Sequence, residues 1–217
     1  MLRSSFGATK RANSVLPLRP EEEPEHLVQR AEEFFAARDL PTVFQIPSQG
    51  FEVLDGYLAA QGFDSVGRTV IAYAPTASVS AGAEHARVRV SRSVECAADW
   101  FDCYVGVDGR AEYAAEVKLI LERTPSLYLS AALPSGVAGT ARLTVIDDVA
   151  VLSCMAVRPE ARRQGIARAL IGAALDAAQE RDVVAIGLQI VESNTPARAL
   201  YAAAGFAEVD GYHYRVR

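Results

Sequence analysis

The chain has 217 residues, of which 50% are hydrophobic, with three cysteines and a formal net charge of −5. This hydrophobic share supplies an ordinary core without disulfide or metal support, and the acidic balance disfavours sequence-independent nucleic-acid binding, which needs a broad basic surface. The sequence shows neither a leader pattern nor an apolar stretch of membrane-spanning length. We therefore expect a cytoplasmic protein with free thiols, no nucleic-acid partner and no membrane partner.

Hydrophobic periodicity and turn residues predict alternating strands and helices in the first part of the chain. The expected order is strand 8–18, helix 24–38, strand 42–46, helix 51–63 and strand 66–74. Pro24 suits the first turn of one helix, and Gly62 closes the other as a C-terminal cap. The small and polar residues of 75–85 are the best candidate for a linker.

The second part of the chain continues this alternation. The expected order is strand 86–94, helices 98–105 and 112–124, strands 126–133, 137–148 and 149–157, helix 162–181, strand 183–192, helix 195–206 and strand 210–217. The element order of 9–74 recurs at 149–216, and "YLAAQGF" at 57–63 resembles "LYAAAGF" at 200–206. We therefore predict an internal tandem repeat.

The stretch "CMAVRPEARRQGIARAL" at 154–170 gathers positive charge where a strand leads into an amphipathic helix. The start of a helix has unpaired N–H groups and the positive end of the helix dipole, which suits phosphates. Gly165 lets a ligand approach the backbone closely, and Arg162, Arg163 and Arg168 add charge around it. The first copy has "RPEEEPEHLVQRAE" at this place, with glutamates and no glycine. The second copy alone is therefore expected to receive a diphosphate.

The residue pattern separates this stretch from two common phosphate-binding motifs. A nucleoside-triphosphate loop is excluded, because its pattern requires a lysine that is not present here. A dinucleotide fingerprint needs three glycines directly after the strand, whereas this chain has one glycine after a longer loop. A surface helix with solvated arginines stays open as long as the stretch is taken alone.

The same stretch, followed by "LQIVESNTPARALYAAAGF" at 188–206, resembles the GNAT superfamily of acyl-CoA-dependent N-acyltransferases, and the resemblance covers about 110 to 217. One signature, Arg/Gln-x-x-Gly-x-Gly/Ala, corresponds to Arg162, Gly165 and Ala167. The other is an asparagine before a short helix with a tyrosine and a terminal Gly-Phe, which corresponds to Asn194, Tyr201, Gly205 and Phe206. The one departure is Ala167 in place of the commoner glycine, which the family's pattern permits.

The resemblance implies a mixed α/β fold of the acyltransferase type, with a curved mixed sheet flanked by helices. The first half also looks like the longer, two-copy members of this superfamily. Residues 1–83 are therefore expected to form a degenerate, truncated N-terminal half-domain. Residues 84–217 are expected to form the catalytic domain.

The resemblance also implies which residues bind the co-substrate, acetyl-CoA. The strand residues Met155, Ala156 and Val157 pair through their backbone with the pantetheine arm. The pyrophosphate site is expected to comprise the motif residue Arg162 and the amides of Arg163, Gln164, Gly165, Ile166, Ala167 and Arg168. Asn194 orients the arm, and Tyr201 points at the sulfur.

These residues predict transfer of an acetyl group from acetyl-CoA to a primary amine of a small molecule or peptide, by direct attack in a ternary complex. An amide N–H near Met155 to Val157 is expected to stabilise the oxyanion, and Tyr201 to protonate the leaving thiolate. Glu112, Glu116 and Glu192 are candidate bases, but none is assigned this role. The alternative is a CoA-binding regulatory module with an inactive acceptor site.

Neither a metal nor a further cofactor is expected, because His26, His85 and His213 are scattered without ligand spacing. The expected partners are acetyl-CoA and an amine acceptor. A homodimer is left open.

Overall fold

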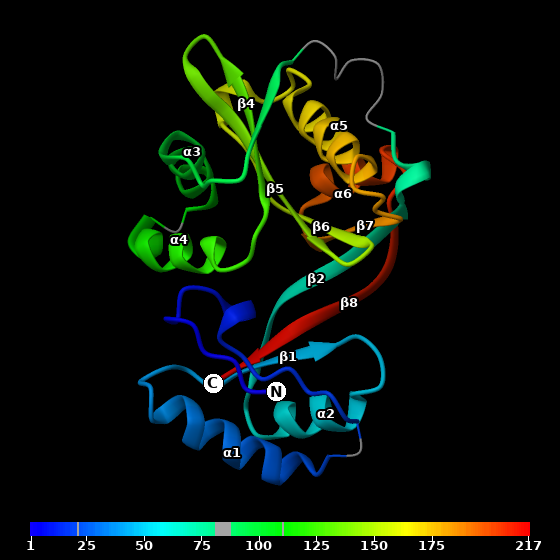
Figure 1. The fold of residues 1–217 in the computed structure, drawn as a ribbon. Helices are drawn as coiled ribbons and strands as arrows, with labels where there is room; N and C mark the ends of the chain where they lie inside the picture. Colours follow the sequence, from blue (N-terminus) through cyan, green and yellow to red (C-terminus); the bar gives the residue numbers. More distant parts are fainter. Residues whose placement is uncertain (21, 81–87, 110) are drawn as a thin grey trace. The chain divides into compact units, whose positions relative to one another are not determined.

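The structure is a computed structural model that describes residues 1–20, 22–80, 88–109 and 111–217. Its α-helices are α1 (Pro24–Ala36), α2 (Glu52–Ala60), α3 (Ala98–Asp108), α4 (Ala114–Glu122), α5 (Ile166–Gln179) and α6 (Thr195–Ala203). Its strands are β1 (Val43–Pro47), β2 (Asp64–Pro75), β3 (Val90–Ser93), β4 (Leu127–Leu133), β5 (Gly136–Ile146), β6 (Val149–Val157), β7 (Ala185–Val191) and β8 (Ala207–Val216). The described 3-10 helices are η1 (Lys10–Ala12), η2 (Thr76–Ser78), η4 (Ala111–Tyr113) and η5 (Pro159–Ala161) (Figure 1).

The contacts divide the chain into two compact units. Unit 1 comprises Met1–Ile71, Ile190–Asn194 and Val209–Arg217, and unit 2 comprises Ala72–Gln189 and Thr195–Glu208. The predicted domains, 1–83 and 84–217, are continuous stretches, whereas each unit is assembled from separate stretches. The division of the chain into domains 1–83 and 84–217 therefore stays a prediction.

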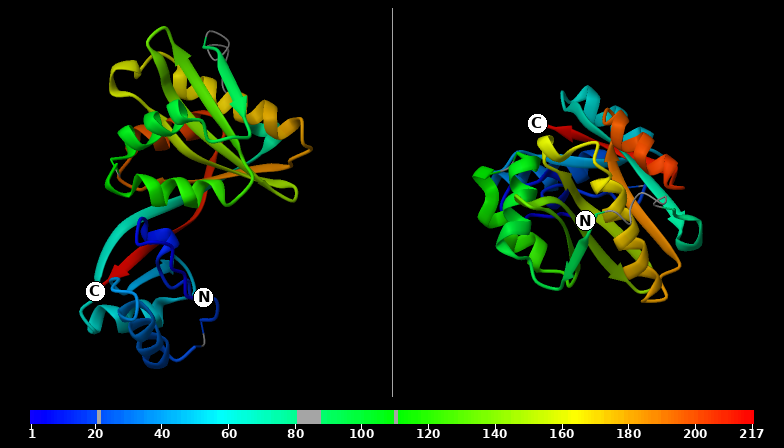
Figure 2. Two further views of the ribbon diagram at one scale, coloured as in Figure 1. Left: turned by 60° about the vertical axis from the view of Figure 1, so that its left-hand side comes forward. Right: turned by 90° about the horizontal axis from the view of Figure 1, so that it is seen from above.

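Unit 2 contains a mixed sheet in the order β2-β7-β6-β5-β4-β3. The strands β3 to β6 pair antiparallel, and β6 pairs parallel with β7 across helix α5. Helix α5 covers one face of this sheet, and α3 and α4 lie on the other face (Figure 2). The predicted mixed α/β fold with helices flanking a sheet is confirmed.

Helix α5 lies close to the sheet because its apolar face meets a glycine. Ile166 and Leu170 are buried, and they lie on the same face one turn apart. A Cβ on Gly139 of β5 would lie 2.5 Å from Cγ2 of Ile166, so a larger residue at Gly139 would push the helix away. The spacing between helix and sheet is thus set by residues at the N-terminal end of α5.

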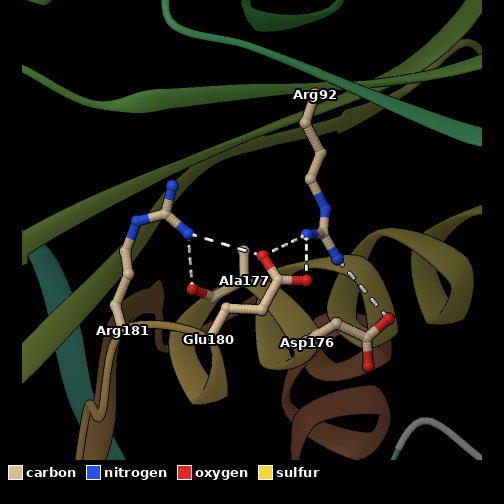
Figure 3. Close-up of polar contacts among 5 residues, drawn as sticks. All are labelled: Arg92, Asp176, Ala177, Glu180 and Arg181. Carbon is tan, nitrogen blue, oxygen red and sulfur yellow. Dashed lines mark hydrogen bonds and ion pairs between the residues drawn. The ribbon is translucent and has the colours of Figure 1, made fainter.

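The C-terminal end of α5 is tied to the edge strand β3 by ion pairs (Figure 3). The Arg92 guanidinium lies 2.7 and 2.8 Å from the two carboxylate oxygens of Glu180 and 3.6 Å from Asp176. Arg181 donates to the Ala177 carbonyl at 2.8 Å. The hydrogen bond from Arg92 lowers the pKa of Glu180. Because the Glu180 carboxylate is exposed, this contact contributes little to stability and mainly positions the end of α5 against β3.

Unit 1 is completed by the last strand of the chain. Within this unit β1 pairs antiparallel with β8, and β8 lies beside β2. Helices α1 and α2 and strand β1 contribute to one buried cluster, which includes Phe35, Leu58 and Phe44. Two contacts attach β8 to α2, because Asp55 accepts from Arg215 at 2.7 Å and lies 2.8 Å from His213.

The predicted strand 8–18 is wrong. Lys10–Ala12 is a 3-10 helix, and the bridges in this segment are at Val15, antiparallel to Leu2 and parallel to Phe44. The Asn13 side chain bonds to the backbone of Ser5, Gly7 and Thr9, at 2.6 to 3.0 Å. Such local side-chain bonds compete with a sheet ladder and explain the turn.

Strand β6 has the predicted bounds, and the other described elements are found with shifted ends. The predicted helix 162–181 begins only at Ile166, because the arginines before it form a loop. In the predicted linker, Thr76–Ser78 is a 3-10 helix, and 81–85 lies outside the described residues, as do the first residues of the predicted strand 86–94. Across the described part of the chain, every helix is too short or too polar to cross a bilayer.

Candidate functional site

The loop between β6 and α5 has a backbone shaped for an anion. Arg163 has a φ of +65° and Gly165 a φ of +79°, both in the left-handed region. Residues in this conformation occur in backbone concavities whose successive N–H groups bind anions. The first bond within the helix runs from the Ala169 N–H to the Gly165 carbonyl at 2.9 Å, so the preceding amides have no carbonyl within the helix.

The structure changes the reason for the glycine in this loop. A Cβ on Gly165 would meet nothing within 4 Å, so free space does not require glycine. Its left-handed conformation favours glycine, because residues with a Cβ are disfavoured there, although Arg163 of the same loop adopts it. Close approach of a ligand at this position, which the sequence predicts, stays a prediction.

A cavity of about 590 Å³ lies at the start of α5, between this loop and helix α6. Its lining includes the predicted residues Val157, Arg162, Arg163, Gly165, Ile166, Ala167 and Arg168. The remaining lining residues are Ala161, Pro196, Ala197, Ala199, Leu200 and Ala203. Two sides of the cavity thus have different characters, one cationic and one made of small apolar side chains.

The α6 residues of this lining were missed by sequence reasoning. Ala197, Leu200 and Ala203 follow at intervals of three, which places them on one helical face. The signal that could have found them is this stripe of mostly small residues directly after the asparagine motif. An alanine-rich stripe is also typical of ordinary helices, so composition alone does not mark it as a binding surface.

Strand β6 separates from β7 beside the cavity. The parallel ladder joins Val149–Leu152 to Ala185–Leu188, and 153–157 lies beyond it. Met155 and Ala156 belong to this open part, next to Val157 in the cavity lining, although they are not lining residues themselves. Gln164 is exposed, and its side-chain amide donates to the Glu160 carbonyl at 3.2 Å.

Tyr201 lies on α6 and is buried, with 6% of its surface exposed. Its ring meets Phe206 edge to face at 5.8 Å between centroids. Burial raises the pKa of Tyr201 to about 12. In the described structure Tyr201 lies outside the cavity lining, although its neighbour Leu200 is part of it.

The remaining predicted residues are not among the residues that line this cavity. Asn194 and Glu192 belong to the segment of unit 1, and the Asn194 N–H donates to the Val191 carbonyl at 2.8 Å. Glu112 is exposed and Glu116 half-buried in unit 2. Their candidate roles stay predictions.

In the ranges that the structure describes, His, Cys, Asp and Glu side chains do not form a group of three that could hold a metal ion. His85, one of the scattered histidines, lies outside those ranges. The described cysteines are free thiols.

Comparison with known proteins gives a consistent family. The model of the acetyltransferase (GNAT) family matches residues 94–206, which is more than half of the chain. The uncharacterized N-acetyltransferase YobR of Bacillus subtilis is 27% identical over 221 aligned residues, covering 100% of this chain and 89% of that protein. The [ribosomal protein bS18]-alanine N-acetyltransferase of Escherichia coli is 41% identical over 64 residues, which cover 30% of this chain and 43% of that protein.

Solved structures share the fold at lower identity. A GCN5-related N-acetyltransferase from Kribbella flavida has a TM-score of 0.66 and 17% identity, over 94% of this chain and 77% of that chain. A tandem GNAT protein from the clavulanic acid biosynthesis pathway has a TM-score of 0.70 and 14% identity, over 89% of this chain and 69% of that chain.

Proposed function

Because the chain belongs to the GNAT acetyltransferase family, we propose that it transfers an acetyl group from acetyl-CoA to a primary amine of a small molecule or peptide. The observation that carries this proposal is the cavity where the left-handed arginine loop, the start of α5 and the open edge of β6 meet. Amine and acetyl-CoA are bound together, and the amine attacks directly.

The described residues fit two parts of coenzyme A, the pyrophosphate and the pantetheine arm. The pyrophosphate lies on the amides of 163–168, and Arg162, Arg163 and Arg168 balance its charge. The pantetheine arm lies along Met155–Val157, since these residues extend beyond the ladder with β7 and an amide-containing chain can pair there as a strand would.

The chemistry then follows from the residues around the thioester. The neutral amine attacks the carbonyl carbon, and a backbone N–H in Met155–Val157 stabilises the oxyanion. The carbon–sulfur bond breaks, and the leaving thiolate takes a proton from the Tyr201 hydroxyl. The attacking nitrogen becomes positively charged and loses one of its two protons to water, since we assign no side chain as the base. Water returns a proton to the Tyr201 oxygen, which completes the cycle.

The pKa of Tyr201 constrains the proton transfer. At about 12, the hydroxyl is protonated at every physiological pH, so the donor is always loaded. A free thiol has a pKa of about 8.5, and a gap of roughly 3.5 units would cost about 5 kcal/mol. The same apolar surroundings also raise the pKa of the thiol, which narrows the gap.

A CoA-binding regulatory module with an inactive acceptor site is the second candidate. The burial of Tyr201 outside the cavity lining is the observation that favours it. Thiol release from acetyl-CoA, measured with a panel of small amines and a peptide with an N-terminal alanine, separates the two. Acetylated product supports the enzyme. Tight CoA binding without any product supports the module.

The origin of residues 1–83 belongs to the same proposal. We interpret residues 1–83 as a truncated second copy that binds no CoA, and we place the protein in the cytoplasm, where acetyl-CoA and reduced thiols coexist. The parallel bridge between Val15 and Phe44 across α1 repeats the parallel pairing of β6 and β7 across α5. One CoA per chain is expected.

A further inference from the structure

Strand β6 contains an extra residue at the point where it separates from β7. Arg142 of β5 pairs with Ser153, and Thr140 pairs with Ala156. Cys154 and Met155 therefore both face the single residue Ala141, which defines a β-bulge. The bulge begins at Cys154, two residues after Leu152, which is the last residue paired with β7.

The bulge holds a residue other than glycine in a left-handed conformation. Cys154 has a φ of +52°, a region that glycine fills at this type of bulge. A side chain in this conformation persists only where the surroundings hold it. The amide of Met155 follows Cys154, so whatever holds Cys154 also sets the direction of that amide.

The Thr140 hydroxyl holds the backbone of the bulge from β5. Thr140 is fully buried at 0% exposure, and its Oγ1 donates to the Cys154 carbonyl at 3.1 Å. Gly139 faces Ile166 of α5, so Thr140 points to the opposite face of the sheet, where α3 lies. A bulge disrupts the ladder locally, and the hydroxyl supplies a donor at that place.

Helix α3 contributes two further contacts at the same place. Burial raises the pKa of the Cys154 thiol, and hydrogen bonds with the Ser153 and Tyr104 side chains act in the opposite direction. The Trp100 indole N–H donates to the Ala141 carbonyl at 3.2 Å, opposite the bulge. Cys154 is thus held through its side chain from α3 and through its carbonyl from Thr140.

We propose that Thr140 is a positioning residue of the acetyl-transfer site. By holding the Cys154 carbonyl it fixes the left-handed bulge and aims the Met155 amide at the carbonyl oxygen of the thioester. This inference rests on the proposed function. Thr140 itself touches neither substrate, so its loss should affect the reaction step and leave CoA binding at the arginine loop intact.

The test compares Thr140→Val, which keeps the shape and loses the hydroxyl, with Thr140→Ser, which keeps the hydroxyl. A misaimed oxyanion donor should lower kcat about 10- to 100-fold in Thr140→Val. The KM for acetyl-CoA and the calorimetric CoA affinity should stay within about twofold, since the arginine loop is unchanged. Thr140→Ser should keep most of the wild-type kcat.

Thr144→Val is the matched control. Thr144 lies on the same strand and face, is also buried, and has its Oγ1 2.8 Å from Oγ of Ser126, away from the bulge. The Thr144→Val variant loses a comparable hydroxyl contact and should keep the wild-type kcat. A wild-type kcat in Thr140→Val, or an equal loss in Thr144→Val, would overturn the proposal.

A readout independent of turnover separates this proposal from the proposed function. Infrared spectra of bound acetyl-CoA labelled with carbon-13 at its carbonyl report how strongly that carbonyl is polarised. The wild type and Thr140→Ser should lower the stretching frequency relative to water, and Thr140→Val should return it toward the value in water. If no amine is acetylated but this pattern holds, the proposed function fails and the role of Thr140 stands. Equal frequencies in all three proteins would refute the role of Thr140.

Discussion

Gly165 offers a test in which backbone and charge effects can be separated. In Gly165→Ala the new Cβ meets nothing within 4 Å, so no clash is introduced. A φ of +79° costs a residue with a Cβ about 1–2 kcal/mol, and the stiffer unfolded chain offsets about 0.4–1 kcal/mol of this. The free energy of unfolding should therefore fall by roughly 1 kcal/mol, which corresponds to about 2–4 °C in Tm.

Gly165→Glu adds a negative charge to the same backbone cost. A carboxylate about 5 Å from the two charges of a diphosphate costs roughly 2–6 kcal/mol in binding, taking an effective dielectric between that of a protein surface and that of water. CoA affinity should then fall by about 30-fold or more relative to Gly165→Ala. The two variants share the φ penalty, so their difference isolates the electrostatic contribution.

Calorimetric titration with CoA and thermal unfolding without ligand measure the two contributions independently. Wild-type CoA affinity in Gly165→Glu would show that the pyrophosphate does not lie at this loop. Unchanged Tm in Gly165→Ala would refute the argument from the left-handed conformation.

Three further predictions concern other parts of the chain. Tyr201→Phe should lower kcat by roughly ten- to a thousandfold with little change in acetyl-CoA affinity. Because the pKa of Tyr201 is about 12, the wild-type kcat should not fall between pH 8 and 10, and a fall in that range would contradict the assignment. Arg215 holds the pKa of Asp55 below its ordinary value. Asp55→Asn should therefore lower the free energy of unfolding by about 1–2 kcal/mol at pH 7. Urea titrations of both proteins should show this difference vanish as the pH falls through the lowered pKa. Calorimetry should give one CoA per chain, and two CoA per chain would refute this. The fragment 84–217 should be poorly soluble, because β8 loses its partner β1. A soluble, active fragment would contradict this expectation.

The sequence is most informative where local pattern and structure coincide. Strand β6 has the predicted bounds 149–157, because its apolar run ends at the charged residues on both sides. The arginine loop was recognised from charge and one glycine, and its residues do line the cavity. The pattern did not reveal the left-handed Arg163, since no residue type there signals a positive φ.

Other features depend on contacts that local patterns do not encode. Cys154 forms a bulge without a glycine to mark it, and only the shifted pairing of Thr140 and Arg142 reveals it. The pairing of β8 with β1 joins residues far apart in the chain, so periodicity predicts the strands and not their partners. Burial of Tyr201 likewise follows from the packing of α6 and not from its composition.

Two helices of this chain start in comparable places and differ in what occupies their positive ends. Helix α1 follows the bridge at Val15 and leads to β1, as α5 follows β6 and leads to β7. Glu23 occupies the N-cap position of α1 without a side-chain bond to the helix, and Glu25 lies in the first turn. Carboxylates of the chain itself thus already complement that dipole. The first turn of α5 has no acidic residue, and arginines precede it. Both helices thus present the positive end of a helix dipole. Of these two ends, the side chains leave the one at α5 for an anionic ligand.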